Sequence, residues 1–296
     1  MTDPRRLYAD AEPLAAAYPP LLAEAERVAA TVNLGVHGRR KPGVGETFWE
    51  YRAYRDGDAA TRVDWRRSAR SDRLYVRENE WEIANTIWIW RSGADRMDFA
   101  SAKNLPTKRH RASVLALALA ILLNRGGERI GLLGKSERAS SGSAAVRRVA
   151  EELGAPGAAR LPRNIELSSH ARIVLIGDFL EPTATLGEEI RRLARGTEQG
   201  CLLQVLDPAE RDFPYSGRTW FQNMAGANEI LFGRAQTIRD AYRRREEAHR
   251  AALADLAREI GWRISTHWTD HAPQTALLAL YQAIAGEAGL AQRRSA

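Results

Sequence analysis

From residue 82 onward, short apolar runs alternate with amphipathic segments of helical spacing, and this alternation most constrains the fold. Runs such as "IANTIWIW" (83–90) and "ARIVLIGDF" (171–179) have the length and apolar content of buried strands. The segments between them, such as 144–154 with its closing glycine, have the periodicity of helices. Strands that alternate with such helices predict a parallel sheet covered on both faces.

The expected strands are 83–90, 129–133, 171–179, 201–207 and 262–268. The expected helices are 107–125, 144–154, 184–196, 234–260 and 273–286. The run "RIVLI" inside 171–179 has no polar alternation, which predicts a central strand. The fold class that follows is α/β, a doubly wound and mostly parallel sheet within a domain of residues 82–296.

Residues 1–81 predict a separate, loop-rich N-terminal extension. The segment 21–32 has helical spacing, whereas 38–50 is glycine-rich, basic and short of apolar residues, which predicts a loop. Residues 51–80 combine arginine, aspartate and aromatic residues without a clear period. A structureless segment of that length is unusual unless it has a function.

Composition narrows the class of protein. Cys201 is the only cysteine among 296 residues, which excludes an intramolecular disulfide and disfavours a thiolate metal site. The first residues lack the apolar core of a secretory signal, and the longest apolar run, 114–123, is about half a membrane span. We therefore expect a soluble cytoplasmic protein without membrane insertion.

The net charge of +7 comes almost entirely from arginine, which pairs well with carboxylates and phosphates. This permits an acidic protein or a nucleic acid as partner. Acidic residues are interspersed throughout, and the segment "RDAYRRREEAHR" (239–250) alternates its charges without an aromatic stacking platform. A nucleic-acid-associated basic protein is therefore the alternative interpretation of the charge.

Motifs that would indicate an enzyme or a cofactor fail on inspection. "GKS" follows a strand, but Arg129 stands where a phosphate-binding loop requires its first glycine. "HWTDH" brings His267, Asp270 and His271 together, and the end of a strand explains it more simply than zinc does. His249 lies in a charged helix and is expected to be solvated. A nucleophile elbow does not occur, so we expect no enzymatic activity and no cofactor.

The segment "YRAYRDGDAATRVDWRRSARSDRLYVRE" (51–78) is the richest in chemistry. Asp58 is a possible N-cap for a single helical turn. Guanidiniums, carboxylates and aromatic rings at this density can interlock, or they can grip an acidic loop or a phosphate backbone. We favour internal scaffolding, in which the charged residues pair with one another or with the main domain. The residues expected to pair are Arg52, Asp58, Arg62, Asp64 and Arg70.

This segment resembles the signature of domain-of-unknown-function family 58, R-x-Y-x-x-G-D-x-x-R-x-I-D-W-x-x-x-A-R. The residues that match are Arg52, Tyr54, Gly57, Asp58, Arg62, Asp64, Trp65, Ala69 and Arg70, with Val63 in place of isoleucine. The resemblance implies a von Willebrand factor A-like domain after the signature. It also implies partnership with an AAA+ ATPase of the MoxR type, and it brings no enzymatic reaction.

In domains of that type the first strand ends in D-x-S-x-S, which holds a divalent cation, and a later strand supplies another aspartate. Family members often have a methionine directly after this motif. When Met97 of "IWIWRSGADRMDF" is aligned with that methionine, Ser92, Ala94 and Arg96 occupy the three ligand positions. Asp178 falls on the later aspartate. A hard cation needs oxygen ligands, so the resemblance implies a degenerate metal site that holds no metal. We expect Arg96 to neutralise Asp178 in place of the cation.

Overall fold

The computed structural model describes residues 41–54, 63–70, 73–81, 85–136, 138–155, 157–163, 165, 167–168, 170–222 and 229–285. These residues form two compact units, one within 41–81 and the other within 85–285. The predicted helix at 21–32 lies outside the described residues.

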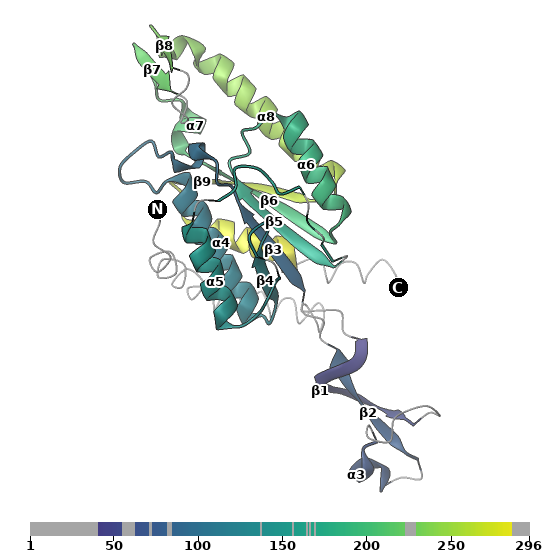
Figure 1. Cartoon of the computed structure of the whole chain (residues 1–296). Coiled ribbons are helices and arrows are strands. Elements are labelled where there is room, and N and C mark those ends of the chain that lie inside the picture. The colour runs from purple at the N-terminus through teal and green to yellow at the C-terminus, as the bar shows by residue number, and fades with distance from the viewer. Residues whose placement is uncertain are drawn as a thin grey trace. The chain divides into compact units, whose positions relative to one another are not determined.

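The larger unit contains a five-stranded sheet in which every neighbouring pair of strands is parallel (Figure 1). Its strands are β3 (Thr86–Arg91), β4 (Arg129–Leu132), β5 (Ala171–Gly177), β6 (Gln199–Leu206) and β9 (Arg263–Trp268). Their order across the sheet is β4-β3-β5-β6-β9. The central strand β5 is buried at every residue, which explains its continuous apolar run. The predicted α/β class and the five predicted strands are confirmed.

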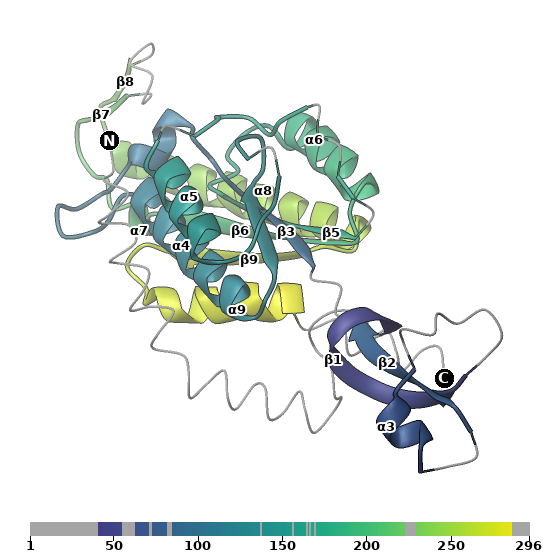
Figure 2. The same cartoon turned by 60° about the horizontal axis from the view of Figure 1, so that its bottom comes forward.

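Helices cover both faces of this sheet (Figure 2). One face carries α4 (Lys108–Arg125), α5 (Ser143–Gly154) and α9 (Pro273–Ala285), and the other carries α6 (Thr183–Arg195) and α8 (Arg239–Glu259). Successive side chains of a strand point to opposite faces, so Ile87 and Ile89 pack in the first layer while Trp88 and Trp90 pack in the second. The five helices predicted between residues 107 and 286 are present, and α8 starts five residues later than expected.

Helix α4 is apolar on all sides in its middle, where every residue from 112 to 123 is buried. Such a helix must be surrounded by other elements, and α4 packs against α5, α9 and the sheet. The hydroxyl of Thr107 accepts a hydrogen bond from the His110 N–H at the start of the helix. This start brings the side chain of Lys108 to the carboxyl edge of the sheet.

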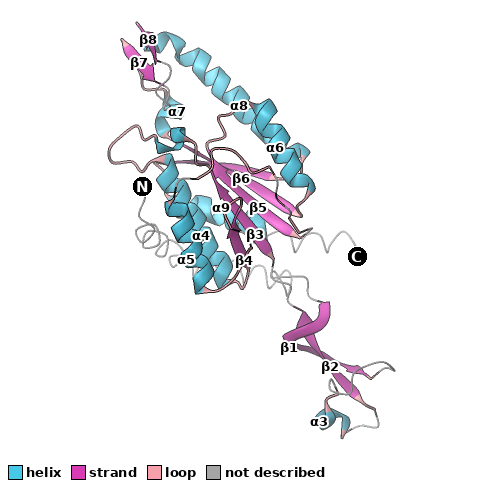
Figure 3. Ribbon diagram, viewed as in Figure 1, coloured by secondary structure: helices cyan, strands magenta, loops and turns pink. Residues whose placement is uncertain are grey.

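One short α-helix and two short strands of the larger unit were not predicted. They are α7 (Pro208–Asp212) and the hairpin of β7 (Thr219–Gln222) with β8 (Glu229–Phe232). The hairpin lies beside the N-terminal end of α8 (Figure 3). Four-residue strands are too short to show a period in the sequence.

The smaller unit corrects one prediction. The segment 38–50, expected to be a loop, contributes to strand β1 (Lys41–Ala53), which pairs antiparallel with β2 (Tyr75–Trp81). The register shifts between Gly43 and Phe48, and again between Phe48 and Glu50. These irregularities accommodate the glycines that suggested a loop, because a bulge relaxes the period of two. Helix α3 (Trp65–Ser68) completes the described part of this unit.

Candidate functional site

The candidate site lies at the carboxyl ends of β3 and β5, which are neighbours in the sheet. From β3 the chain first adds β4 on one side and then β5 on the other, so the winding direction reverses between β3 and β5. Open α/β sheets bind ligands at such a switch point. The Ser92 N–H donates to the Ile176 carbonyl oxygen at 2.8 Å and ties the two strand ends together.

Asp178 follows β5 and is fully buried. Two cations reach its carboxylate: the Nε of Arg96 at 2.9 Å, from the 3-10 helix η2 (Asp95–Asp98), and the Nζ of Lys108 at 3.1 Å. The predicted contact between Arg96 and Asp178 is confirmed. Burial opposes the charge of Arg96, but Asp178 and Glu181 outweigh it and raise the pKa of Arg96. The carboxylate is thus compensated from within the chain.

Lys108 belongs to this candidate site, and the sequence interpretation missed it. Its side chain is 1% exposed, and its ammonium also donates to Oε1 of Glu210 at 2.7 Å. A lysine in the first turn of a helix faces the positive end of the helix dipole, so it requires carboxylate partners. A lone lysine at the start of an apolar helix, at the edge where strands end, was the available signal.

Glu210 and Asp207 complete this polar cluster from the segment after β6. Glu210 and Asp207 form a capping box at the start of α7. In this box the Asp207 side chain accepts a hydrogen bond from the Glu210 N–H, and the Glu210 side chain accepts one from the Asp207 N–H. Burial raises the pKa of Glu210, and the charge of Lys108 opposes that rise. Asp207 is fully buried and accepts from the N–H groups of Ala209 and Ser101, both at 2.9 Å.

The other two predicted ligand positions are buried among protein atoms. Ser92 is 2% exposed and its hydroxyl accepts from the Ala94 N–H at 3.4 Å, while Ala94 itself is 5% exposed. Gly93 is held so closely that a Cβ would lie 2.0 Å from the carbonyl oxygen of Gly157. The structure therefore brings Ser92, Ala94, Arg96 and Asp178 to one sheet edge.

These residues do not fit a divalent cation. A hard cation needs several oxygen ligands around it, whereas Asp178 already contacts two cationic side chains that would repel one. Among the described residues, no group of three or more His, Cys, Asp or Glu side chains could hold a metal ion. The edge is a closed network of ion pairs.

The outer rim of the edge is formed by residues 179–181. Phe179 has a left-handed backbone, with φ of 50°, which is a strained conformation for a bulky residue. Its carbonyl oxygen lies 2.6 Å from Nε2 of His249 on α8. The prediction that His249 is solvated is wrong, because the ring is half-buried in this contact. The turn leaves the side chain of Leu180 43% exposed and directs Glu181 to Arg96.

The "HWTDH" residues occupy the end of β9 and the turn after it. His267 is 4% exposed, and burial, followed by the charge of Arg111, lowers its pKa to about 4. Arg111 donates to the Thr269 carbonyl oxygen at 3.1 Å, and Asp270 lies 3.4 Å from Arg211. Each contact joins the strand end to a neighbouring element.

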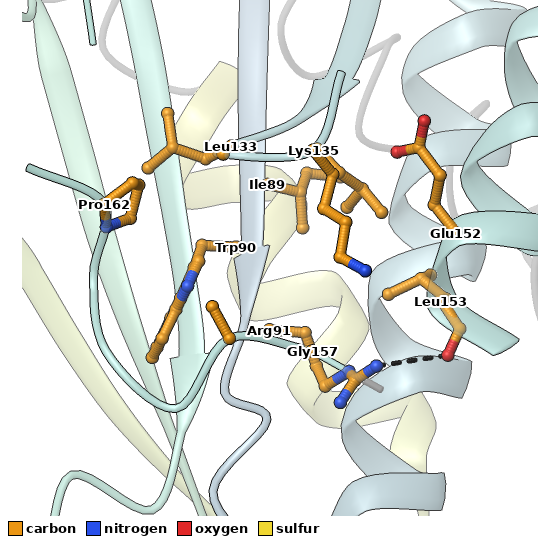
Figure 4. Close-up of a pocket in the computed structure, with 12 residues that line it drawn as sticks. Ile89, Trp90, Arg91, Leu133, Lys135, Glu152, Leu153, Gly157 and Pro162 are labelled. Atoms are coloured by element: carbon orange, nitrogen blue, oxygen red, sulfur yellow. Dashed lines mark hydrogen bonds between the residues drawn. The ribbon is translucent and has the colours of Figure 1, made fainter. Parts of the chain in front are cut away.

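A small pocket beside the ends of β3 and β4 includes Trp90, Arg91, Lys135 and Glu152 in its lining (Figure 4). Its volume of about 50 Å³ is far below the roughly 300 Å³ at which ligand sites begin. Arg91 donates to the carbonyl oxygens of Leu153 and Ala155, each at 3.1 Å, where α5 ends. Burial and then Arg109 lower the pKa of Arg91 to about 10. This arginine caps the helix, and the pocket does not fit a nucleotide.

The signature residues belong to the smaller unit. Asp64 caps α3 by accepting from the Arg67 N–H at 3.0 Å, and Trp65 beside it is 62% exposed. The Tyr54 N–H donates to the Leu74 carbonyl oxygen. Arg52 pairs through its backbone with Val76, and Arg70 is exposed. Gly57, Asp58 and Arg62, including the predicted cap by Asp58, lie outside the described residues. The interlocked network therefore stays a prediction.

A family model described as "Protein of unknown function DUF58" matches residues 50–252, which is more than two thirds of the chain. The chain belongs to the DUF58 family. The match includes the whole signature and reaches into α8, so it covers residues of both described units. The resemblance to this family that the signature indicated is thereby confirmed.

Uncharacterized proteins from two mycobacteria have sequences similar to this chain. This DUF58 protein is 27% identical over 237 residues to the uncharacterized proteins Mb1516 of Mycobacterium bovis and Rv1480 of Mycobacterium tuberculosis, covering 74% of this chain and 74% of each relative. Similar solved structures include the conserved hypothetical protein BatB from Bacteroides thetaiotaomicron. Its TM-score is 0.42 at 14% identity, over 69% of this chain and 99% of BatB. An aerotolerance-related membrane protein from Bacteroides fragilis matches with a TM-score of 0.38 at 13% identity, over 68% and 98%. Within the described part of this chain, no helix is long and apolar enough to cross a membrane.

Proposed function

We propose that this DUF58 protein is a non-enzymatic interaction module that works with a MoxR-type AAA+ ATPase, as an adaptor or scaffold in the cytoplasm. Within this proposal the sheet is of von Willebrand factor A type. Support for that type comes from the parallel strands, the helices on both faces and the polar cluster where β3 and β5 end. The family resemblance supports the partner.

One observation carries the proposal: the buried carboxylate of Asp178 is compensated by Lys108 and Arg96, at the edge where a ligand would otherwise bind. An enzyme needs a nucleophile, acid or base that can reach a substrate. Here the buried acids form ion pairs or accept hydrogen bonds from backbone N–H groups instead. In the proposal the positions of Ser92, Ala94, Arg96 and Asp178 are a degenerate metal site whose role is structural. In this proposal the edge presents a surface to a partner protein and does not bind a cation.

The proposal is tested by measuring binding of the purified protein to the MoxR-type ATPase of the same organism, with ADP and with a non-hydrolysable ATP analogue. We expect a complex in at least one nucleotide state. Failure to bind in both states would contradict the proposal. The nucleic-acid alternative predicts a different result, namely retention of a random DNA duplex that weakens steeply between about 50 and 200 mM salt.

A further inference from the structure

The hairpin of β7 and β8 extends from the same carboxyl edge, because it follows β6 and α7 and returns to α8 (Figure 1). It exposes two large apolar side chains, Trp220 at 62% and Ile230 at 56%. The large apolar side chains exposed among the described residues are Trp65, Leu74, Leu180, Trp220 and Ile230. Two of these five therefore lie on one ribbon of eight paired residues.

The base of the hairpin is fixed by aromatic packing. The Phe213 ring lies 4.9 Å from that of Tyr242, 5.2 Å from Tyr215 and 5.8 Å from Phe221, measured between centroids. Arg239 donates to the carbonyl oxygens of Phe213 and Tyr215. The hydroxyl of Tyr242 donates to the Glu210 carbonyl oxygen at 2.9 Å and so joins the cluster to the edge. Because the base of the ribbon is already held in place, binding to a partner would cost little conformational entropy in the ribbon.

The two exposed anchors point in opposite directions. Trp220 pairs across the hairpin with Leu231, and Phe221 pairs with Ile230. Directly opposite residues share a face and successive residues alternate, so Trp220 and Ile230 project from different faces of the ribbon. A flat surface could cover only one of them. A cleft that receives the ribbon could cover both.

The charge around the hairpin indicates the chemistry of that cleft. Residues 213–250 contain seven arginines and four carboxylates, Glu229, Asp240, Glu246 and Glu247, so the segment keeps an excess of positive charge. Such a field attracts an acidic surface and disfavours a second copy of the same basic ribbon. Tryptophan with arginine is the composition of energetically dominant residues in protein interfaces.

We propose that the β7–β8 hairpin docks into an acidic, apolar-floored cleft of a partner protein, with Trp220 and Ile230 as its anchors. The identity of the partner rests on the proposed function, in which it is the MoxR-type ATPase. The arginines act at the rim and speed association, while the two anchors slow dissociation.

The test measures the dissociation constant of the ATPase for the full-length protein, for Trp220→Ala and for Ile230→Ser. Trp65→Ala is the matched control, since Trp65 is also 62% exposed but lies in the other unit. We expect Trp220→Ala to weaken binding by at least about tenfold, and Ile230→Ser to weaken it less. Trp65→Ala should leave binding within about twofold of the wild type. Circular dichroism should show unchanged folding.

Each outcome separates the two proposals. If the wild type does not bind the ATPase, the proposed function fails and the docking assignment fails with it. If the wild type binds and Trp220→Ala binds equally well, only the hairpin assignment is wrong. Sedimentation with vesicles of equal parts phosphatidylglycerol and phosphatidylcholine that depends on Trp220 would assign the hairpin to membranes instead. A dimer that depends on Trp220 in sedimentation velocity would assign it to self-association.

Discussion

The ammonium of Lys108 lies 3.1 Å from the carboxylate of Asp178, and both side chains are inaccessible to solvent. The same ammonium reaches Glu210 at 2.7 Å, so one buried cation joins the end of β5 to α7. Buried charges are tolerated only when they are paired and hydrogen-bonded. This arrangement underlies our account of the edge as a closed network that presents a surface.

Replacing Lys108 by methionine should destabilise the protein strongly. The change keeps the apolar stem but leaves Asp178 with Arg96 alone and Glu210 without its cation. Removal of one partner of a buried ion pair commonly costs about 3–5 kcal/mol. Chemical denaturation measures this loss as a lower free energy of unfolding. Lys103→Met, at an exposed lysine near the same edge, is the control and should change little. Equal stability of the two variants would show that the ion pairs contribute nothing.

Gly200→Ala should lower the melting temperature because of a steric clash. A Cβ at this position of β6 would lie 2.3 Å from the ring of Trp262, which has no flexible end to move aside. Overpacking of this kind costs about 1–3 kcal/mol, which corresponds to about 2–4 °C per kcal/mol in a unit of this size. Gly196→Ala is the matched control, since its nearest neighbour is the Leu193 carbonyl oxygen at 3.9 Å. A melting temperature unchanged in both variants would mean that Trp262 is not packed on β6.

His267 should make stability fall as the pH is lowered. Its pKa is about 4 in the folded chain and 6.5 without the fold. The unfolded state therefore binds a proton first, and stability is lost between about pH 6.5 and 4, by at most about 3 kcal/mol. The charged groups that act on the pKa of the ring are Arg111, His271 and Asp270. His267→Asn should flatten this part of the curve of unfolding free energy against pH. An unaltered slope would assign the acid sensitivity to other groups.

The main sheet could be predicted from the sequence because its inner strands β5 and β6 are buried at every residue. The runs 171–179 and 201–207 have no polar alternation, which is typical of short strands buried on both faces of a parallel sheet. The pairing of Arg96 with Asp178 followed from the family resemblance, which assigned both residues to the metal-site positions of neighbouring strand ends. The sheet was thus predicted from periodicity, and the ion pair from the resemblance.

The remainder depended on contacts that a sequence does not display. Strand β1 was taken for a loop because its pairing comes from backbone hydrogen bonds and its bulges hide the period of two. Lys108 was overlooked because its partners Asp178 and Glu210 are 70 and 102 residues away. The β7–β8 hairpin has strands too short for a pattern, and its support comes from aromatic rings spread from Phe213 to Tyr242.

The most direct test of the closed edge is a thermal-shift titration of the full-length protein with Mg²⁺ and Mn²⁺. A ligand stabilises a protein only through the state to which it binds. Because Lys108 and Arg96 already contact Asp178, we predict no change in melting temperature at millimolar cation, both in the wild type and in Asp178→Asn. A rise of several degrees in the wild type that is absent from Asp178→Asn would show that a cation binds at this edge, and would contradict the account.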